Sequence, residues 1–317
     1  MHWRRPGNCR HLREGLRTRK TKIGLALGSG SARGWAHIGA IRALEERGIR
    51  PDIVCGTSIG ALVGAFYAAG ELDRLERWVT SLAWTHVLRL MDLTWRGGLI
   101  RGNRLFTLFR SSFGDRDIRE LAVPFGAVAT ELASGRELWL REGPVLEAVR
   151  ASCAMPGLFT PVIREDVIVV DGGLVNPVPV SLCRALGAEL VIAVDLSWGK
   201  LGPYRERGRG KDGDVVVAPR EMPGWLGRLR PGWLQRQSKA KSDEVGVPSI
   251  FEVFTTALDI VEMKVARSRL AGEPADVLLT PLLPNFATME FHRAAEAIAE
   301  GRAAVERMAP LIEQVVR

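Results

Sequence analysis

Ser58 stands in a setting that is typical of a catalytic nucleophile. It is the centre of a Gly-x-Ser-x-Gly pattern between Gly56 and Gly60, which follows the apolar run at 52–55 and precedes the small, apolar residues at 61–70. A strand, a sharp turn and a helix in this order form a nucleophile elbow, whose glycines leave room for a strained turn. The N-terminus of such a helix also favours a developing anion. A serine in an ordinary glycine-rich turn is the alternative interpretation.

Asp171 is the preferred candidate for the base that such a serine needs. It follows the apolar run at 167–170 and precedes two glycines, the position at which α/β folds place catalytic groups. Asp195, after the apolar run at 190–194, is a competing carboxylate, which we rank lower because no glycine turn follows it. The alternative interpretation of Asp171 is a turn cap, the common use of Asp-Gly.

None of the histidines is expected at a position that suits the base of an ordinary Ser–His–Asp triad. Two of the five lie in a basic segment at the N-terminus, and His37 is expected to pack within the helix that follows the first glycine-rich loop. His292 is expected inside an amphipathic helix, whereas the histidine of an α/β-hydrolase triad normally lies on a loop after a strand. The remaining arrangement is a dyad, in which Asp171 takes the proton of Ser58 directly.

The glycine-rich loop at 28–34 follows an expected strand at 22–27 and exposes backbone N–H groups toward an anion. A dinucleotide pyrophosphate is one candidate, since the three glycines approximate the Rossmann fingerprint. The oxyanion of an acyl intermediate fits better, because this loop and the serine turn end adjacent parallel strands. Arg33 either orients the loop, meets an anionic group of the substrate, or is solvated at the start of a helix.

The positive charge is concentrated at the N-terminus of the 317 residues. Residues 1–22 hold eight basic residues and one acidic residue, a net charge of +7 out of the total of +8. The rest of the chain is close to neutral, which argues against a nucleic-acid-binding surface spread over the domain. We predict that residues 1–21 form a basic, disordered arm and that residues 22–317 form a single domain.

The composition predicts a cytoplasmic protein. The arm lacks the apolar region of a secretory signal, and the longest nearly apolar run, at 59–69, is too short to span a bilayer. The four cysteines are widely spaced, with no metal-ligand rhythm, which is typical of reduced thiols. A hydrolase that uses a Ser–Asp dyad implies no metal and no cofactor.

A second basic stretch, at 198–247, interrupts the alternation of helices and strands. It holds eleven basic and six acidic residues among glycines, prolines and tryptophans. We interpret it as a mobile insertion of the domain. The tryptophans and arginines at 224–236 suit peripheral contact with the inner face of a membrane, and a surface loop without membrane contact is the alternative interpretation.

Three motifs together resemble those of the patatin-like phospholipases, and their order and spacing resemble the bacterial RssA-type branch related to neuropathy target esterase. They are the loop at 28–34, the serine turn at 56–60 and the Asp-Gly-Gly at 171–173. The resemblance covers nearly the whole chain after the basic arm and includes the segments at 151–157 and 291–294.

The resemblance implies a three-layer α/β/α fold with a mainly parallel central sheet, and hydrolysis of lipid acyl esters by a Ser–Asp dyad. Carried over position by position, Ser58 is the nucleophile and Asp171 is the base. Serine stands at two loop positions where family members more often have glycine, and the added Cβ atoms would narrow the loop. The residues that correspond to the oxyanion loop are Ser29, Gly30, Ser31 and Arg33.

The expected function is a serine acyl hydrolase of the lipid esterase, phospholipase A or lysophospholipase type, acting through an acyl-enzyme on a lipid or another acyl ester. One alternative is a non-catalytic lipid-binding or regulatory protein that retains the fold. The other is a nucleotide-binding oxidoreductase that uses the loop at 28–34, which tight NADPH binding would favour.

Overall fold

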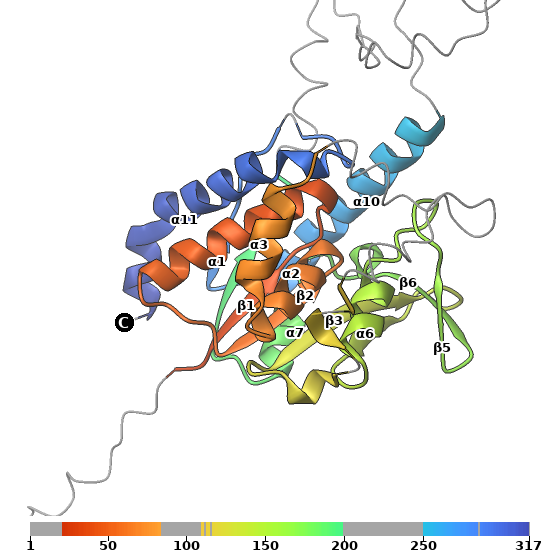
Figure 1. Ribbon diagram of the computed structural model, residues 1–317, viewed down its shortest axis with the longest axis horizontal. Coiled ribbons are helices and arrows are strands. Elements are labelled where there is room, and N and C mark those ends of the chain that lie inside the picture. The colour runs from red at the N-terminus through yellow and green to blue at the C-terminus, as the bar shows by residue number, and fades with distance from the viewer. Residues whose placement is uncertain are drawn as a thin grey trace, which may run out of the picture.

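The computed structural model describes residues 21–83, 109–110, 112–114, 116–198, 250–284 and 286–316 (Figure 1). The predicted basic arm, apart from its last residue, lies outside these ranges. The predicted insertion at 198–247 also lies outside them, apart from its first residue.

Within the described residues, one mixed sheet of eight strands forms the central layer. The strands are β1 Ile23–Leu27, β2 Ile53–Thr57, β3 Phe125–Glu131, β4 Glu137–Leu140, β5 Val162–Arg164, β6 Val167–Asp171, β7 Leu190–Val194 and β8 Val277–Leu279. Their order is β5-β6-β3-β2-β1-β7-β8, and β4 pairs with β3. The run from β3 to β8 is parallel, whereas β4, β5 and β6 join the sheet antiparallel. The predicted mainly parallel sheet is therefore confirmed.

Helices cover both faces of this sheet. They are α1 Ala36–Glu46, α2 Ile59–Ala68, α3 Leu72–Thr80, α6 Val145–Ser152, α7 Val180–Ala185, α10 Ile250–Gly272 and α11 Ala294–Val316. Successive side chains of a strand point to opposite faces, so Leu25 and Leu27 belong to the core shared with α1, α2 and α11, while Ala26 belongs to the core shared with α7. The three-layer α/β/α prediction is confirmed. Of the described helices, none combines the length and the apolarity needed to cross a bilayer.

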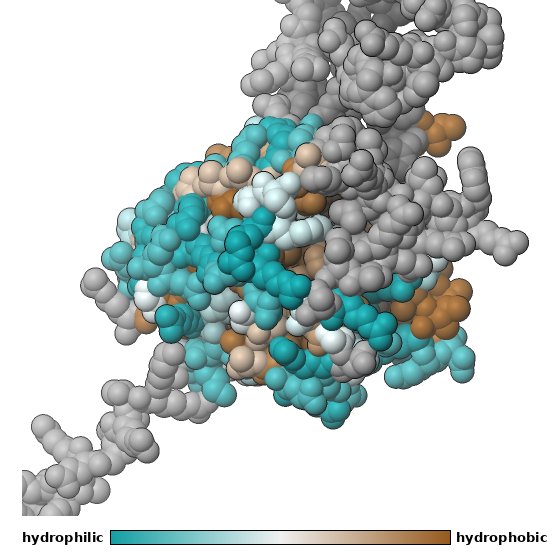
Figure 2. Space-filling view, in the orientation of Figure 1, coloured by the Kyte–Doolittle hydropathy of each residue, from teal (hydrophilic) through white to brown (hydrophobic). Residues whose placement is uncertain are grey.

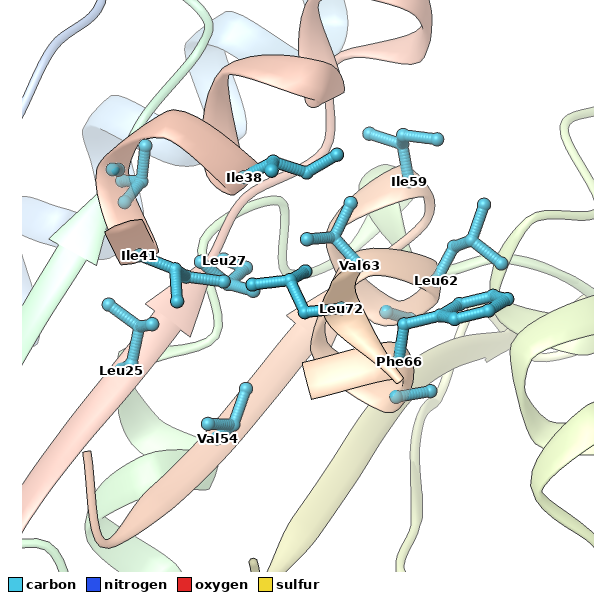
Figure 3. Close-up of a cluster of buried hydrophobic side chains, with 14 of the residues drawn as sticks. Leu25, Leu27, Ile38, Ile41, Val54, Ile59, Leu62, Val63, Phe66 and Leu72 are labelled. Carbon is cyan, nitrogen blue, oxygen red and sulfur yellow. The ribbon is translucent and has the colours of Figure 1, made fainter. Parts of the chain in front are cut away.

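The larger core lies between the sheet and helices α1 and α2. Figure 3 shows Leu27 of β1, Ile38 and Ile41 of α1, and Val63 of α2 gathered in one cluster, and all of them are fully buried. Ile38 and Ile41, with Leu44, are the residues that the helical spacing predicts for the buried face of α1. The outer surface of this layer is mainly hydrophilic (Figure 2), so α1 and α11 present their apolar sides inward.

Helices α1 and α11 cross with their backbones in contact. A Cβ atom built on Gly39 of α1 would overlap the carbonyl oxygen of Ile298, and one built on Gly301 of α11 would overlap the carbonyl oxygen of Ala36. Both obstacles are backbone atoms, which cannot move without displacing a helix. The crossing therefore fixes α11 against the start of α1, close to the glycine-rich loop.

We expect Gly301→Ala to lower the free energy of unfolding by about 2 kcal/mol or more, because the added methyl group forces the helices apart. Gly272→Ala is the matched control: nothing lies within 4 Å of the added Cβ, and alanine is the better helix former. The control variant should be neutral, or more stable by up to about 1 kcal/mol. Urea denaturation of both variants measures the difference, and equal midpoints would contradict the backbone contact.

Candidate active site

Ser58 occupies the sharp turn between β2 and α2. Its backbone has φ 56° and ψ −124°, a conformation with positive φ that a residue with a side chain rarely adopts. A Cβ on Gly56 would overlap the backbone of Gly60, and a Cβ on Gly60 would overlap the carbonyl oxygen of Leu27. Close contact with neighbouring backbone therefore excludes a side chain at either glycine.

Asp171 ends β6 directly beside this turn. The hydroxyl of Ser58 donates a hydrogen bond of 2.5 Å to Oδ2 of Asp171, and the second carboxylate oxygen accepts one of 2.7 Å from the N–H of Gly173. Both side chains are buried. The structure thus brings the two residues predicted as nucleophile and base into direct contact.

Strand register explains how the last residue of an antiparallel strand reaches this place. Thr57 of β2 pairs with Val128 of β3, and the next residue of β3, Ala129, pairs with Asp171. Strand β6 enters from the edge where the parallel strands end, and the part of β3 that it pairs with is the C-terminal part, residues 129–131. The β3 residues that pair with Thr57 and with Asp171 are therefore adjacent, which places Asp171 beside the serine turn. The sequence predicted the strand end but not its direction.

The C-terminal end of α6 and the turn after it hold both members of this pair. The Ser152 hydroxyl accepts a hydrogen bond of 2.9 Å from the backbone N–H of Ser58, and the Ala154 carbonyl accepts one of 3.0 Å from the backbone N–H of Asp171. Burial raises the pKa of the Cys153 thiol well above its usual range, the Asp171 charge raises it further, and a hydrogen bond with Ser58 opposes the shift. A neutral thiol thus lies against the pair. Residue types alone did not single out Ser152 or Cys153, although both fall within the segment at 151–157 that carries the family resemblance.

The glycine-rich loop adjoins the serine turn, since a Cβ on Gly34 would overlap the Ile59 side chain. The Ser29 N–H donates to the carbonyl of Pro177 at 2.8 Å and is therefore engaged. Within the described ranges, the N–H groups of Gly30 and Ser31 donate to no backbone carbonyl. Of the backbone N–H groups at the predicted oxyanion positions, these two are therefore not used in backbone hydrogen bonds that hold the loop.

Arg33 lies in a short 3-10 helix, Ser31–Trp35, which takes up the second half of the predicted loop at 28–34. Its side chain is buried and donates to the carbonyl of Phe286 at 2.8 Å and to Asp259 of α10 at 3.3 Å. Its backbone N–H donates to the carbonyl of Gly30. Of the three interpretations of Arg33, orientation of the loop agrees with these contacts, and a solvated arginine does not.

The competing residues are engaged elsewhere. Asp195 accepts hydrogen bonds from the N–H and hydroxyl of Ser197, at 2.8 and 2.9 Å, and so caps the turn after β7. His292 lies in a 3-10 helix, Phe291–Arg293, just before α11. In the described part of the chain, no histidine is hydrogen-bonded to Ser58. No group of three or more His, Cys, Asp or Glu residues in that part is arranged to hold a metal ion.

His37 lies beneath the glycine-rich loop and is completely buried, as its predicted packing requires. Its Nε2 is 2.8 Å from the carbonyl oxygen of Gly28, so Nε2 carries the proton that makes this hydrogen bond. Burial lowers the pKa of His37 to about 4, although the bond to Gly28 opposes the shift. The neutral imidazole therefore supports the first residue of the loop.

The sequence and the fold of this chain are similar to those of known proteins. Residues 25–184 match the family model described as patatin-like phospholipase. An uncharacterized NTE family protein of Mycobacterium tuberculosis is 34% identical, with 89% of each chain covered. Human patatin-like phospholipase domain-containing protein 6 is 29% identical over 85% of this chain but only 19% of its own length. The crystal structure of VipD from Legionella pneumophila superposes with a TM-score of 0.39 at 12% identity, covering 93% of this chain and 67% of that one.

The buried His37 predicts a pH dependence of stability. Its pKa is about 4 in the folded chain and near 6.5 in the unfolded one, so protonation favours unfolding. The contribution is complete above pH 6.5 and is lost as the pH falls toward 4. We expect the wild type to lose about 2 kcal/mol more unfolding free energy than His37→Gln between pH 7 and pH 5.

Glutamine keeps an amide donor for the Gly28 carbonyl and does not titrate, and all other ionisable groups are the same in both proteins. Urea denaturation at the two pH values measures the difference. Parallel losses of stability in the two proteins would show that His37 is not the titrating group.

Proposed function

This chain belongs to the patatin-like phospholipase family, and from that premise we propose that it is a serine acyl hydrolase acting on lipid esters, of the lipid esterase, phospholipase A or lysophospholipase type. The observation that carries the proposal is the 2.5 Å hydrogen bond from the Ser58 hydroxyl to Asp171. A serine hydroxyl is a weak nucleophile until a base takes its proton, and this carboxylate is placed to accept it.

The proposed reaction proceeds through an acyl-enzyme. As Oγ of Ser58 attacks the ester carbonyl carbon, its proton passes to Asp171, and the carbonyl oxygen becomes an oxyanion near the N–H groups of Gly30 and Ser31. The intermediate collapses, and the leaving alcohol takes the proton from Asp171. A water molecule then attacks the acyl-enzyme while Asp171 accepts its proton. The acid is released, and the proton returns to Ser58.

Three features of the site support this assignment. The positive φ of Ser58 is a strained backbone conformation, and such strain clusters at functional sites. Asp171 is held by the Gly173 N–H and by its own backbone N–H, so its position does not depend on the substrate. The N-terminus of α2 begins at the residue after Ser58, where its unpaired N–H groups favour negative charge.

Ser58→Ala and Asp171→Asn test the proposal. We expect each variant to lose several orders of magnitude in the hydrolysis of a medium-chain nitrophenyl ester. Ser58→Ala should also abolish labelling by a fluorophosphonate probe, because no alcohol remains to react. Asp195→Asn is the matched carboxylate control and should retain activity, since Asp195 only caps a turn.

Circular dichroism establishes that each variant is folded. Residual activity of Ser58→Ala near the wild-type value would reject the assignment. A native wild type that binds liposomes but neither hydrolyses the ester nor reacts with the probe would favour the non-catalytic lipid-binding alternative.

Ser152→Ala tests the support of the nucleophile. Without the hydroxyl, the buried N–H of Ser58 loses its acceptor and the strained turn can relax, so we expect kcat to fall about tenfold with KM little changed. Ser268→Ala, an exposed serine of α10, is the control. Unchanged kcat in a folded Ser152→Ala would show that this hydrogen bond does not position Ser58.

A further inference from the structure

Helix α10 contacts the glycine-rich loop through two carboxylates on the same side of the helix. Asp259 and Glu262 are three positions apart and therefore lie on one helix face. Asp259 accepts a hydrogen bond from the Arg33 side chain at 3.3 Å, and Glu262 accepts one from the Ser29 hydroxyl at 3.0 Å. Ser29 and Glu262 are 233 positions apart, and both are buried.

Ser29 is held by two hydrogen bonds, one from its backbone and one from its side chain. Its backbone N–H donates to the Pro177 carbonyl, in the segment that follows Asp171, and its hydroxyl donates to Glu262 of α10. The next two residues, Gly30 and Ser31, carry the N–H groups that we assign to the oxyanion. Gly30 and Ser31 directly follow Ser29 in the chain. A shift of Ser29 would therefore move their N–H groups relative to Ser58.

Glu262 also borders the turn that carries the base. A Cβ built on Gly173 would stand 2.7 Å from Oε1 of Glu262 and 3.1 Å from Oδ1 of Asp171, so the two carboxylates flank the same glycine. One oxygen of Glu262 thus faces the glycine-rich loop, and the other faces the Asp171 turn. A single side chain of α10 lies between the two halves of the site.

The Ser29 hydroxyl supplies a hydrogen-bond donor to the buried carboxylate of Glu262. A buried carboxylate is costly unless hydrogen bonds satisfy it, and a glycine would remove the donor that Ser29 supplies. We propose that Glu262 is a positioning residue, which acts through the Ser29 hydroxyl to hold the N–H groups of Gly30 and Ser31 against the oxyanion. This inference rests on the proposed function and assigns to α10 the task of fixing the oxyanion loop.

The test compares Ser29→Ala, Glu262→Gln, Glu262→Leu and the double variant Ser29→Ala/Glu262→Leu. Loss of a hydrogen bond to a charged group predicts that kcat of Ser29→Ala and Glu262→Leu falls about ten- to a hundredfold, with KM changed less than about threefold. Glu262→Gln keeps an acceptor oxygen and should stay within about fivefold of the wild-type kcat. The double variant should be no worse than the poorer single variant, because both changes remove the same bond.

Hydrolysis of a medium-chain nitrophenyl ester, the rate of fluorophosphonate labelling and the melting temperature are measured for every variant. Glu313→Gln, on the exposed side of α11, is the matched control. If Glu262→Leu does not fold, Ser29→Ala alone decides, since it deletes only the hydroxyl.

Wild-type kcat in folded Ser29→Ala or Glu262→Leu would overturn the inference. So would a loss in the double variant equal to the product of the single losses, or a loss in Glu262→Gln as large as in Glu262→Leu. In these cases the active wild type leaves the proposed function standing. A wild type that neither hydrolyses the ester nor reacts with the probe overturns the proposed function and this inference together.

Discussion

The hydrogen bond between Ser58 and Asp171 joins segments 113 positions apart, and much of the surrounding structure serves to keep them together. The register of β2, β3 and β6 brings the two residues to neighbouring positions of the sheet. The last residue of α6, Ser152, then accepts a hydrogen bond from the backbone of Ser58, and Ala154, in the turn that follows, accepts one from the backbone of Asp171. In the proposed reaction, preorganisation of this kind reduces the rearrangement that is needed, because the proposed proton acceptor, Asp171, already contacts Ser58.

Close backbone contact is the second constraint on the site. The serine turn fits against β1 only because Gly60 lacks a side chain, and the glycine-rich loop fits against the serine turn only because Gly34 lacks one. Beneath the loop, His37 meets the Gly28 carbonyl as a neutral imidazole, and Glu262 meets the Ser29 hydroxyl. Buried polar groups of this kind are stable only when they are paired, so they fix one position of the loop.

The features that were predicted from the sequence are those that depend on residues close together in the chain. The Gly-x-Ser-x-Gly turn, the apolar strands and the helical spacing of Ile38 and Ile41 each depend on neighbours within a few positions. The antiparallel direction of β6, and the contacts of Ser152 and Glu262, depend on partners far along the chain. A hydrogen bond between distant segments leaves no period in the sequence, and a buried glutamate in a helix looks like a surface one until its neighbours are known.

The contact between α1 and α11 bears on how the protein is made. Helix α1 leaves the ribosome well before α11, which is synthesised last among the described elements, yet the two backbones touch at Gly39 and Gly301. Translation proceeds at roughly 5–20 residues per second, so α11 follows α1 on the order of tens of seconds later. The apolar side of α1 is not covered by α11 during that time. During this interval the apolar side of α1 lacks its partner helix, and chaperones commonly bind exposed apolar surface of this kind. The pairing of α1 with α11 is thus completed only after α11 has left the ribosome.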